Sequence, residues 1–148
     1  MRFRPALISV CAFLSVTAIR GTAQCGPKME EQVAAVRNSW VTNWNGGHLD
    51  NVVNLYDSHA DLLAADGSRA SGQDEIRASL QKPIASAAKV EVHSVRSACS
   101  KELAYDNGTY TQTAKGQFAE GNYLLVLRWK DGQWVIVQHA ATVKRQTN

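Results

Sequence analysis

Large apolar residues in the first half of the chain recur with the period of an α-helix. Four of them are spaced by three or four positions and so share one helix face: Val33, Val36, Trp40 and Trp44. Gly26-Pro27 fits the start of this helix, because proline is accommodated in the first turn. Asn45-Gly46-Gly47 fits its end, because glycine suits the left-handed cap.

Two further helices and a strand follow within the next forty residues. Leu49, Val52, Val53 and Tyr56 predict the buried face of a short second helix. The apolar run 61–65 closes on the turn signal Asp66-Gly67 and predicts a strand. Ser71-Gly72 leads into a third helix, which we expect to end at Pro83.

From Lys89 onward the apolar period changes from that of a helix to that of a strand. Alternating or β-branched and aromatic residues predict strands over 89–97, 103–113, 123–130 and 134–142. Helices followed by antiparallel strands indicate an α+β fold with helices on one face of a sheet. The 148 residues suffice for one domain, which we place at 24–148.

The last two predicted strands form a hairpin. Asp131-Gly132 is the preferred centre of a type I′ turn, which pairs Trp129 with Trp134, Leu127 with Ile136 and Leu124 with His139. In this register one face carries Tyr123, Leu125, Leu127, Trp129, Trp134, Ile136 and Gln138, and the other carries Leu124, Val126, Arg128, Val135, Val137 and His139. Neither face is polar, so both should be covered, one by the helices and one by a second subunit.

The first 23 residues have the order of a secretory signal peptide. Arg2 and Arg4 precede the apolar run ALISVCAFLSV, and small residues at 21–23 suit cleavage after Ala23. The apolar run is shorter than the ~20 residues of a membrane span, and an uncleaved anchor is the alternative. We therefore expect a secreted or periplasmic protein with no membrane association after removal of the leader.

Loss of the leader changes the charge and the cysteine count. It leaves 13 basic and 13 acidic residues, so no basic excess indicates nucleic-acid binding. It also leaves Cys25 and Cys99, which in an exported protein predict one disulfide, with two free thiols as the alternative.

Three segments of the chain resemble a known superfamily. They are NWNGGHLD, the segment from DG to SGQDEIR, and the closing KDGQWVIVQHAAT. Together they are similar to the NTF2-like superfamily, in its SnoaL-like and DUF4440 branch, over roughly residues 33–142. The resemblance implies a cone-shaped NTF2-like (cystatin-like) α+β fold, in which a curved antiparallel sheet wraps the N-terminal helices around a pocket, commonly as a homodimer.

The superfamily hosts isomerases, cyclases, hydrolases, dehydratases and plain binding or association domains, so fold alone does not give function. The hydrogen-bonding tyrosine of its ketosteroid isomerases falls here on Trp40, and their aspartate base falls on Leu63 or Ala64. Neither residue can do that chemistry, which disfavours isomerase activity.

The same comparison assigns the two faces of the hairpin. It places Val126, Val137, His139 and, near the rim, Arg128 in the pocket, together with Trp40, Trp44 and Tyr56 from the helices. It leaves an outer face for a homodimer partner: Tyr123, Leu125, Trp129, Trp134 and Ile136. The reversed assignment of the two faces stays open.

His139 is the candidate for catalysis, because a histidine near neutral pKa can donate or accept a proton; a hydrogen-bonded core histidine is the alternative. The other histidines lack metal-ligand spacing, so we expect no metal and no cofactor. The close spacing of Asp57, Asp61 and Asp66 is a weaker signal of paired-carboxylate chemistry.

Three hypotheses follow. The chain is an exported protein that binds an apolar or aromatic small molecule, or a cofactor-free enzyme of isomerase, cyclase or hydrolase type that uses His139, or a non-catalytic association module. An open pocket would favour the first two, and a pocket filled by side chains would favour the third.

Overall fold

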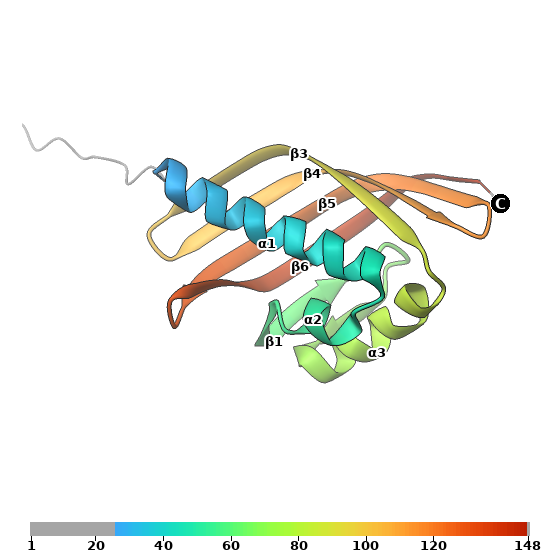
Figure 1. Ribbon diagram of the computed structural model, residues 1–148, viewed down its shortest axis with the longest axis horizontal. Coiled ribbons are helices and arrows are strands. Elements are labelled where there is room, and N and C mark those ends of the chain that lie inside the picture. Colours follow the sequence, from blue (N-terminus) through green and yellow to red (C-terminus); the bar gives the residue numbers. More distant parts are fainter. Residues whose placement is uncertain (1–25, 148) are drawn as a thin grey trace, which may run out of the picture.

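The structure is a computed structural model that describes residues 26–147. Three helices precede or interrupt a six-stranded sheet (Figure 1). The helices are α1 (Pro27–Gly46), α2 (Leu49–Val53) and α3 (Gly72–Ala85). The strands are β1 (Tyr56–Leu63), β2 (Arg69–Ser71), β3 (Lys89–Ser100), β4 (Leu103–Ala114), β5 (Gln117–Lys130) and β6 (Gln133–Thr147).

The predicted helices are present, with two differences at their boundaries. α1 begins at Pro27 and ends where Gly47 adopts a left-handed φ of 76°, as the sequence indicates. Tyr56 starts β1 instead of closing the second helix, because α2 ends after a single turn at Val53. Pro83 lies inside α3, which continues to Ala85, since a proline removes one main-chain hydrogen bond without forbidding a final turn.

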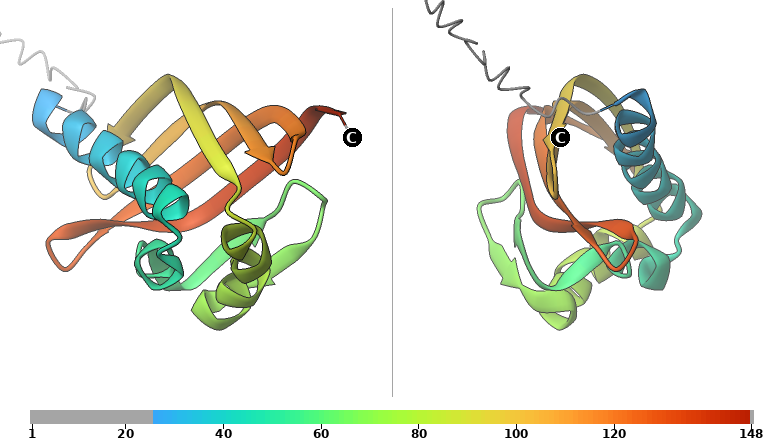
Figure 2. Two further views of the ribbon diagram at one scale, coloured as in Figure 1. Left: turned by 45° about the vertical axis from the view of Figure 1, so that its right-hand side comes forward. Right: turned by 90° about the vertical axis from the view of Figure 1, so that its left-hand side faces the viewer.

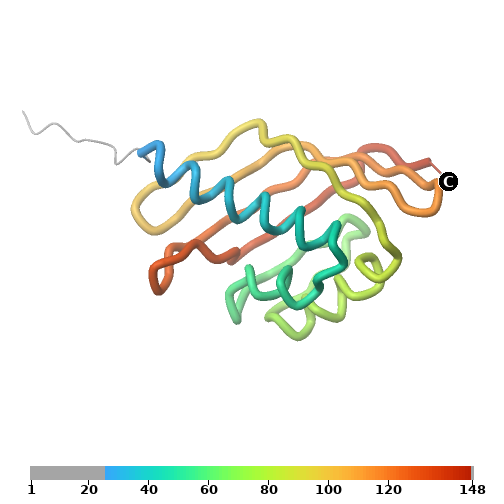
Figure 3. Tube along the Cα trace, in the orientation of Figure 1, coloured from blue at the N-terminus to red at the C-terminus, as the bar shows by residue number. Residues whose placement is uncertain are grey.

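The sheet has the order β2-β1-β6-β5-β4-β3. The four long strands are antiparallel neighbours, whereas β1 pairs with β6 in parallel. The sheet curls around one side of α1, which lies across its concave face, while α2 and α3 close the end near β1 (Figures 1 and 2). The Cα trace shows the end of the sheet nearest the C-terminus extending beyond α1 (Figure 3). Within residues 26–147, no helix is long and apolar enough to cross a membrane.

The β5–β6 hairpin contains an extra residue that the predicted register lacks. Its turn is as expected, with positive φ at Asp131 and Gly132, and the pairs from Lys130–Gln133 to Leu127–Ile136 are correct. Beyond them Val126 pairs with Gln138 and Leu125 with His139, so Val137 is a β-bulge. Ile136 and His139, on either side of the bulge, therefore face the same side of the sheet.

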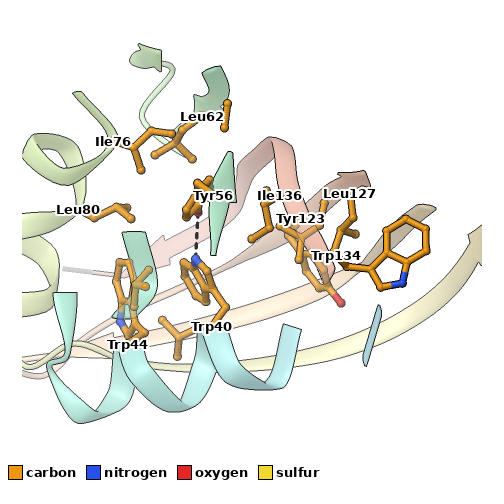
Figure 4. Close-up of a cluster of buried hydrophobic side chains, with 14 of the residues drawn as sticks. Trp40, Trp44, Tyr56, Leu62, Ile76, Leu80, Tyr123, Leu127, Trp134 and Ile136 are labelled. Carbon is orange, nitrogen blue, oxygen red and sulfur yellow. Dashed lines mark hydrogen bonds between the residues drawn. The ribbon is translucent and has the colours of Figure 1, made fainter. Parts of the chain in front are cut away.

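The bulge corrects the predicted assignment of the two faces. The residues assigned to a dimer surface lie on the concave face, where they belong to the hydrophobic core, pack against it or line the cavity: Tyr123, Leu125, Trp129, Trp134 and Ile136. Figure 4 labels Tyr123, Trp134 and Ile136 in this core. Val126, Arg128 and Val137, assigned to the pocket, are not among the residues that line it. The prediction failed because strand side chains alternate with a period of two, and one inserted residue exchanges the faces of all those beyond it.

Two predictions concern residues outside the described part of the chain. The signal peptide was assigned to residues 1–23, and Cys25 is one half of the predicted disulfide. Cys99 lies in β3, opposite Ala104 of β4, and is partly buried against the core. The leader and the Cys25–Cys99 bond stay predictions.

Candidate functional site

A cavity of about 500 Å³ lies between α1 and the concave face of the sheet. We call it the main cavity. Its floor comes from β3–β6, one wall from α1, and the other from α3 and the turn between β1 and β2. The lining residues on which the argument below depends are Arg37, Trp40, Trp44, Tyr110, Tyr123, Leu125 and His139.

Two tryptophans form the apolar wall. Trp40 and Trp44 are one helical turn apart on α1, and their rings stack with centroids 4.8 Å apart and an interplanar angle of 24°. The Trp44 Nε1–H donates to the carbonyl of Ala88 at 2.9 Å, and the Trp40 Nε1–H donates to the hydroxyl of Tyr56 at 2.9 Å. Because both indole N–H groups are bonded within the protein, the rings offer apolar surface to the cavity.

His139 ends a buried chain of hydrogen bonds. Trp40 donates to the Tyr56 oxygen, and that hydroxyl lies 2.7 Å from Nδ1 of His139 (the first bond is dashed in Figure 4). An indole N–H can only donate, so the Tyr56 proton is available for Nδ1, which then accepts. The imidazole is therefore the neutral tautomer with its proton on Nε2.

Burial fixes these protonation states. It lowers the pKa of His139 to about 4 and raises the pKa of Tyr56 far above its usual value. At neutral pH His139 is uncharged, and it lines the main cavity whereas Tyr56 lies behind it. The ring can thus offer a ligand its Nε2–H as a hydrogen-bond donor, a role that differs from that of a general acid with a neutral pKa.

A second polar cluster lies where α1 crosses β4 and β5. Asp106 is fully buried and accepts hydrogen bonds from Arg37 at 2.6 Å, from the Tyr123 hydroxyl at 2.5 Å and from Ser94 at 3.2 Å. Burial and the bond to Asp106 raise the pKa of Tyr123. The Arg37 charge that faces the cavity is thus balanced by a carboxylate directly behind it.

Tyr110 differs from the other two buried tyrosines. Its side chain is 8% exposed, yet its hydroxyl has no hydrogen-bond partner among residues 26–147. The ring lies against Gly121 of β5, where a Cβ would come within 2.9 Å of Tyr110 Cε1. The hydroxyl therefore remains available on the cavity floor.

The structure brings together only part of the predicted site. Trp40, Trp44 and His139 line the main cavity, and Tyr56 supports His139 from behind. The catalytic role of His139 stays a prediction. The three nearby aspartates do not form a pair: Asp57 binds Lys130, Asp61 binds Ser71 and Arg69, and Asp66 binds Ser68.

The sequence interpretation missed Arg37 and Asp106 as site residues, and it assigned Tyr123 to the outer face. A signal for the first two exists in the pattern. Arg37 occupies the apolar stripe of α1, four residues after Val33 and three before Trp40. Asp106 lies on the same inward face of β4 as the buried Ala104 and Tyr110, because all three are separated by even numbers of residues. A charged residue on each of two inward faces indicates a buried ion pair.

The potential for metal binding is limited in the described residues. Among residues 26–147, no three His, Cys, Asp or Glu side chains come close enough to hold a metal ion. Asp66, whose carboxylate accepts two bonds from Ser68, is the one carboxylate among the residues that line the main cavity.

The Asp106 cluster predicts unequal effects of removing two tyrosine hydroxyls. Tyr123→Phe should lower the free energy of unfolding by roughly 1.5–3 kcal/mol, because a buried carboxylate loses a donor. Tyr110→Phe removes a hydroxyl that has no partner among the described residues and should stay within about 0.5 kcal/mol of the wild type. Urea unfolding measures both; equal losses in the two variants would contradict the assigned role of Asp106.

Burial of neutral His139 predicts a loss of stability in acid. The unfolded imidazole takes up a proton near its ordinary pKa of 6.5, but the folded one does so only near 4. Neutral His139 therefore contributes about 3 kcal/mol to the free energy of unfolding. This contribution is complete above pH 6.5 and is lost as the pH falls toward 4. Between pH 6.5 and 4, the free energy of unfolding of the wild type should fall by this amount relative to that of His139→Gln. NMR titration should find the folded imidazole still neutral at pH 5.5. An imidazole that titrates near 6.5 in the folded protein would refute this.

Comparisons with known proteins agree with this architecture. A search of curated proteins gives no match. An NTF2-like protein of unknown function from Shewanella oneidensis superposes with a TM-score of 0.69 at 19% identity, covering 77% of this chain and 98% of the other. A candidate calcium/calmodulin-dependent protein kinase II association domain from Xanthomonas campestris gives 0.68 at 22%, covering 80% and 89%.

A candidate scytalone dehydratase from Novosphingobium aromaticivorans also superposes, with a TM-score of 0.68 at 13% identity, covering 81% of this chain and 87% of the other. At these identities the likeness shows the fold alone, which is the NTF2-like or cystatin-like α+β fold. The SnoaL-like domain model matches residues 38–137, which include α1 from Asn38 and most of the sheet. The chain therefore belongs to the SnoaL-like domain family, and its fold is the NTF2-like one.

Proposed function

We propose that this chain is an exported protein that binds a small, flat, apolar or aromatic molecule in the main cavity. The observation that carries the proposal is the cavity itself, which side chains leave open at about 500 Å³. This lies within the roughly 300–1,000 Å³ of small-molecule sites, which combine an apolar lining with a few placed polar groups. An association module would need no such space.

The chemistry of the lining favours a neutral ligand. The stacked Trp40 and Trp44 rings supply a flat apolar surface. The Arg37 charge is neutralised by Asp106, and His139 is uncharged at neutral pH. The other two charged residues of the lining, Lys82 of α3 and Asp66 of the β1–β2 turn, carry opposite charges. His139 Nε2–H and the Tyr110 hydroxyl can each donate to a carbonyl or hydroxyl oxygen of the ligand.

Turnover by the same cavity is the second candidate. A neutral imidazole that donates from Nε2 can stabilise negative charge that develops on a carbonyl oxygen, as an oxyanion-hole donor does. The likeness to the candidate scytalone dehydratase is compatible with such chemistry without requiring it. His139→Ala separates the two candidates: turnover lost with binding retained would make the protein an enzyme.

The binding proposal predicts that filling the main cavity abolishes binding. Leu125→Trp places an indole on the cavity floor, whereas Asn122→Trp places the same side chain at an exposed position of the same strand. Screening the leader-free protein against neutral coumarins, flavones and anthraquinones by thermal shift should find a stabilising ligand. Quenching of Trp40 and Trp44 fluorescence should then follow its titration.

For that ligand, Leu125→Trp should weaken binding at least tenfold, and Asn122→Trp should change it less than twofold. A ligand that binds both variants equally would lie outside the main cavity. Failure of every compound to bind would refute the proposed function.

We further propose a homodimer, with the interface moved to the convex face of the sheet. Leu124 is 39% exposed there, and the half-buried Val126 lies two residues away on the same strand. An exposed apolar set of this kind suits an isologous contact between two copies.

Light scattering of the leader-free wild type should give twice the chain mass, and Leu124→Lys should give the monomer mass. Val95→Lys, a like change at an exposed position of edge strand β3, should leave the dimer intact. A monomeric wild type would contradict the proposal, as would a dimer that Leu124→Lys does not affect.

A further inference from the structure

A second, smaller depression lies on the sheet beyond the main cavity. We call it the distal groove, and its volume is about 330 Å³. It is lined by Ala65, Asp66, Tyr110, Gln112, Ala114, Gln117, Phe118, Ala119, Val143 and Gln146. It lies where the sheet runs past α1 toward the β4–β5 turn and the C-terminus, so no helix covers it (Figures 1 and 3).

We propose that the ligand of the main cavity carries a neutral, hydroxyl-rich substituent, such as a sugar, which passes over Tyr110 and lies in the distal groove. This inference rests on the proposed function, because it assigns a chemical class to the ligand of the same site. The ligand is then an aromatic glycoside, with its ring system beside Trp40 and Trp44.

Continuity of the two depressions is the first argument. They share four lining residues: Ala65, Asp66, Tyr110 and Gln112. Along β5 the combined floor runs from Leu125 to Gln117, which is roughly 26 Å at the rise of an extended strand. A floor of this length exceeds what one compact aromatic ring system covers, so a ligand that uses all of it has a second part.

Tyr110 is the second argument. The residue is 92% buried by area and lies where the main cavity meets the distal groove, and its hydroxyl has no partner among residues 26–147. The hydroxyl oxygen itself is not fully enclosed, so it is open to a ligand at this junction. A ligand oxygen at this point, such as the glycosidic oxygen between the two parts, would satisfy the O–H of Tyr110.

The side chains of the distal groove are the third argument. Gln112, Gln117 and Gln146 present amides that both donate and accept, and none of them has a side-chain hydrogen bond to another described residue. Amides of this kind pair with hydroxyl groups, which also donate and accept. No lysine or arginine lines the distal groove, so it lacks the cation that an acidic substituent would need.

The test compares aromatic compounds with their own O-glucosides. Coumarin, flavone and anthraquinone aglycones are titrated beside the matching glucosides into the leader-free protein by isothermal calorimetry. We expect a glucoside to bind at least tenfold more tightly than its aglycone. Ala119→Trp, which fills the distal groove, should remove that advantage and leave aglycone binding unchanged.

Tyr110→Phe supplies a second measurement that does not disturb packing, and it should weaken glucoside binding more than aglycone binding. Asn122→Trp is the control for Ala119→Trp, because it adds the same bulk at an exposed position of β5. Glucosides that bind no better than aglycones, or an advantage that survives Ala119→Trp, would overturn the inference and leave the proposed function intact. Failure of both classes to bind would refute the proposed function as well.

Discussion

The extra residue at Val137 determines which side chains this sheet presents to its helices. Without it, His139 and Ala141 would point away from the face that carries Trp134 and Ile136. With it, the residues on both sides of the bulge share the concave face, so one strand contributes to the hydrophobic core at one end and to the main cavity at the other. Two further bulges, at Val95 in β3 and Lys144 in β6, fit the same curvature.

Two polar clusters lie on the concave face and oppose the general rule that cores are apolar. In each cluster the buried polar atoms are paired within the protein. Asp106 accepts from three donors. Nδ1 of His139 accepts from the Tyr56 hydroxyl, which itself accepts from Trp40. A buried charge or hydroxyl without such partners costs several kcal/mol. Both clusters join α1 to the sheet, so they also fix the height of the helix above the floor.

The fold was accessible from the sequence because its signals are local. The start of α1 at Pro27, its cap at Gly47 and the turn at Asp131-Gly132 depend on neighbouring residues alone. Val137 gave no comparable signal, since a valine in a run of valine and isoleucine looks like any other strand residue. The error in the hairpin residues assigned to the pocket and to the dimer surface follows from it. Trp40 and Trp44 were placed correctly because they lie on α1, whose pattern does not depend on the register of the hairpin.

The openness of the main cavity follows from how α1 is held. Arg37 reaches Asp106 from one part of the helix, and Trp40 and Trp44 reach Tyr56 and the Ala88 carbonyl from the next two turns. Each bond has a fixed length, so α1 cannot approach the sheet to fill the space without breaking one of them. On the floor, Ala141 adds only a methyl group to the lining. Collapse would exchange satisfied buried polar groups for a modest gain in apolar contact, and the larger cost of the former keeps the cavity open.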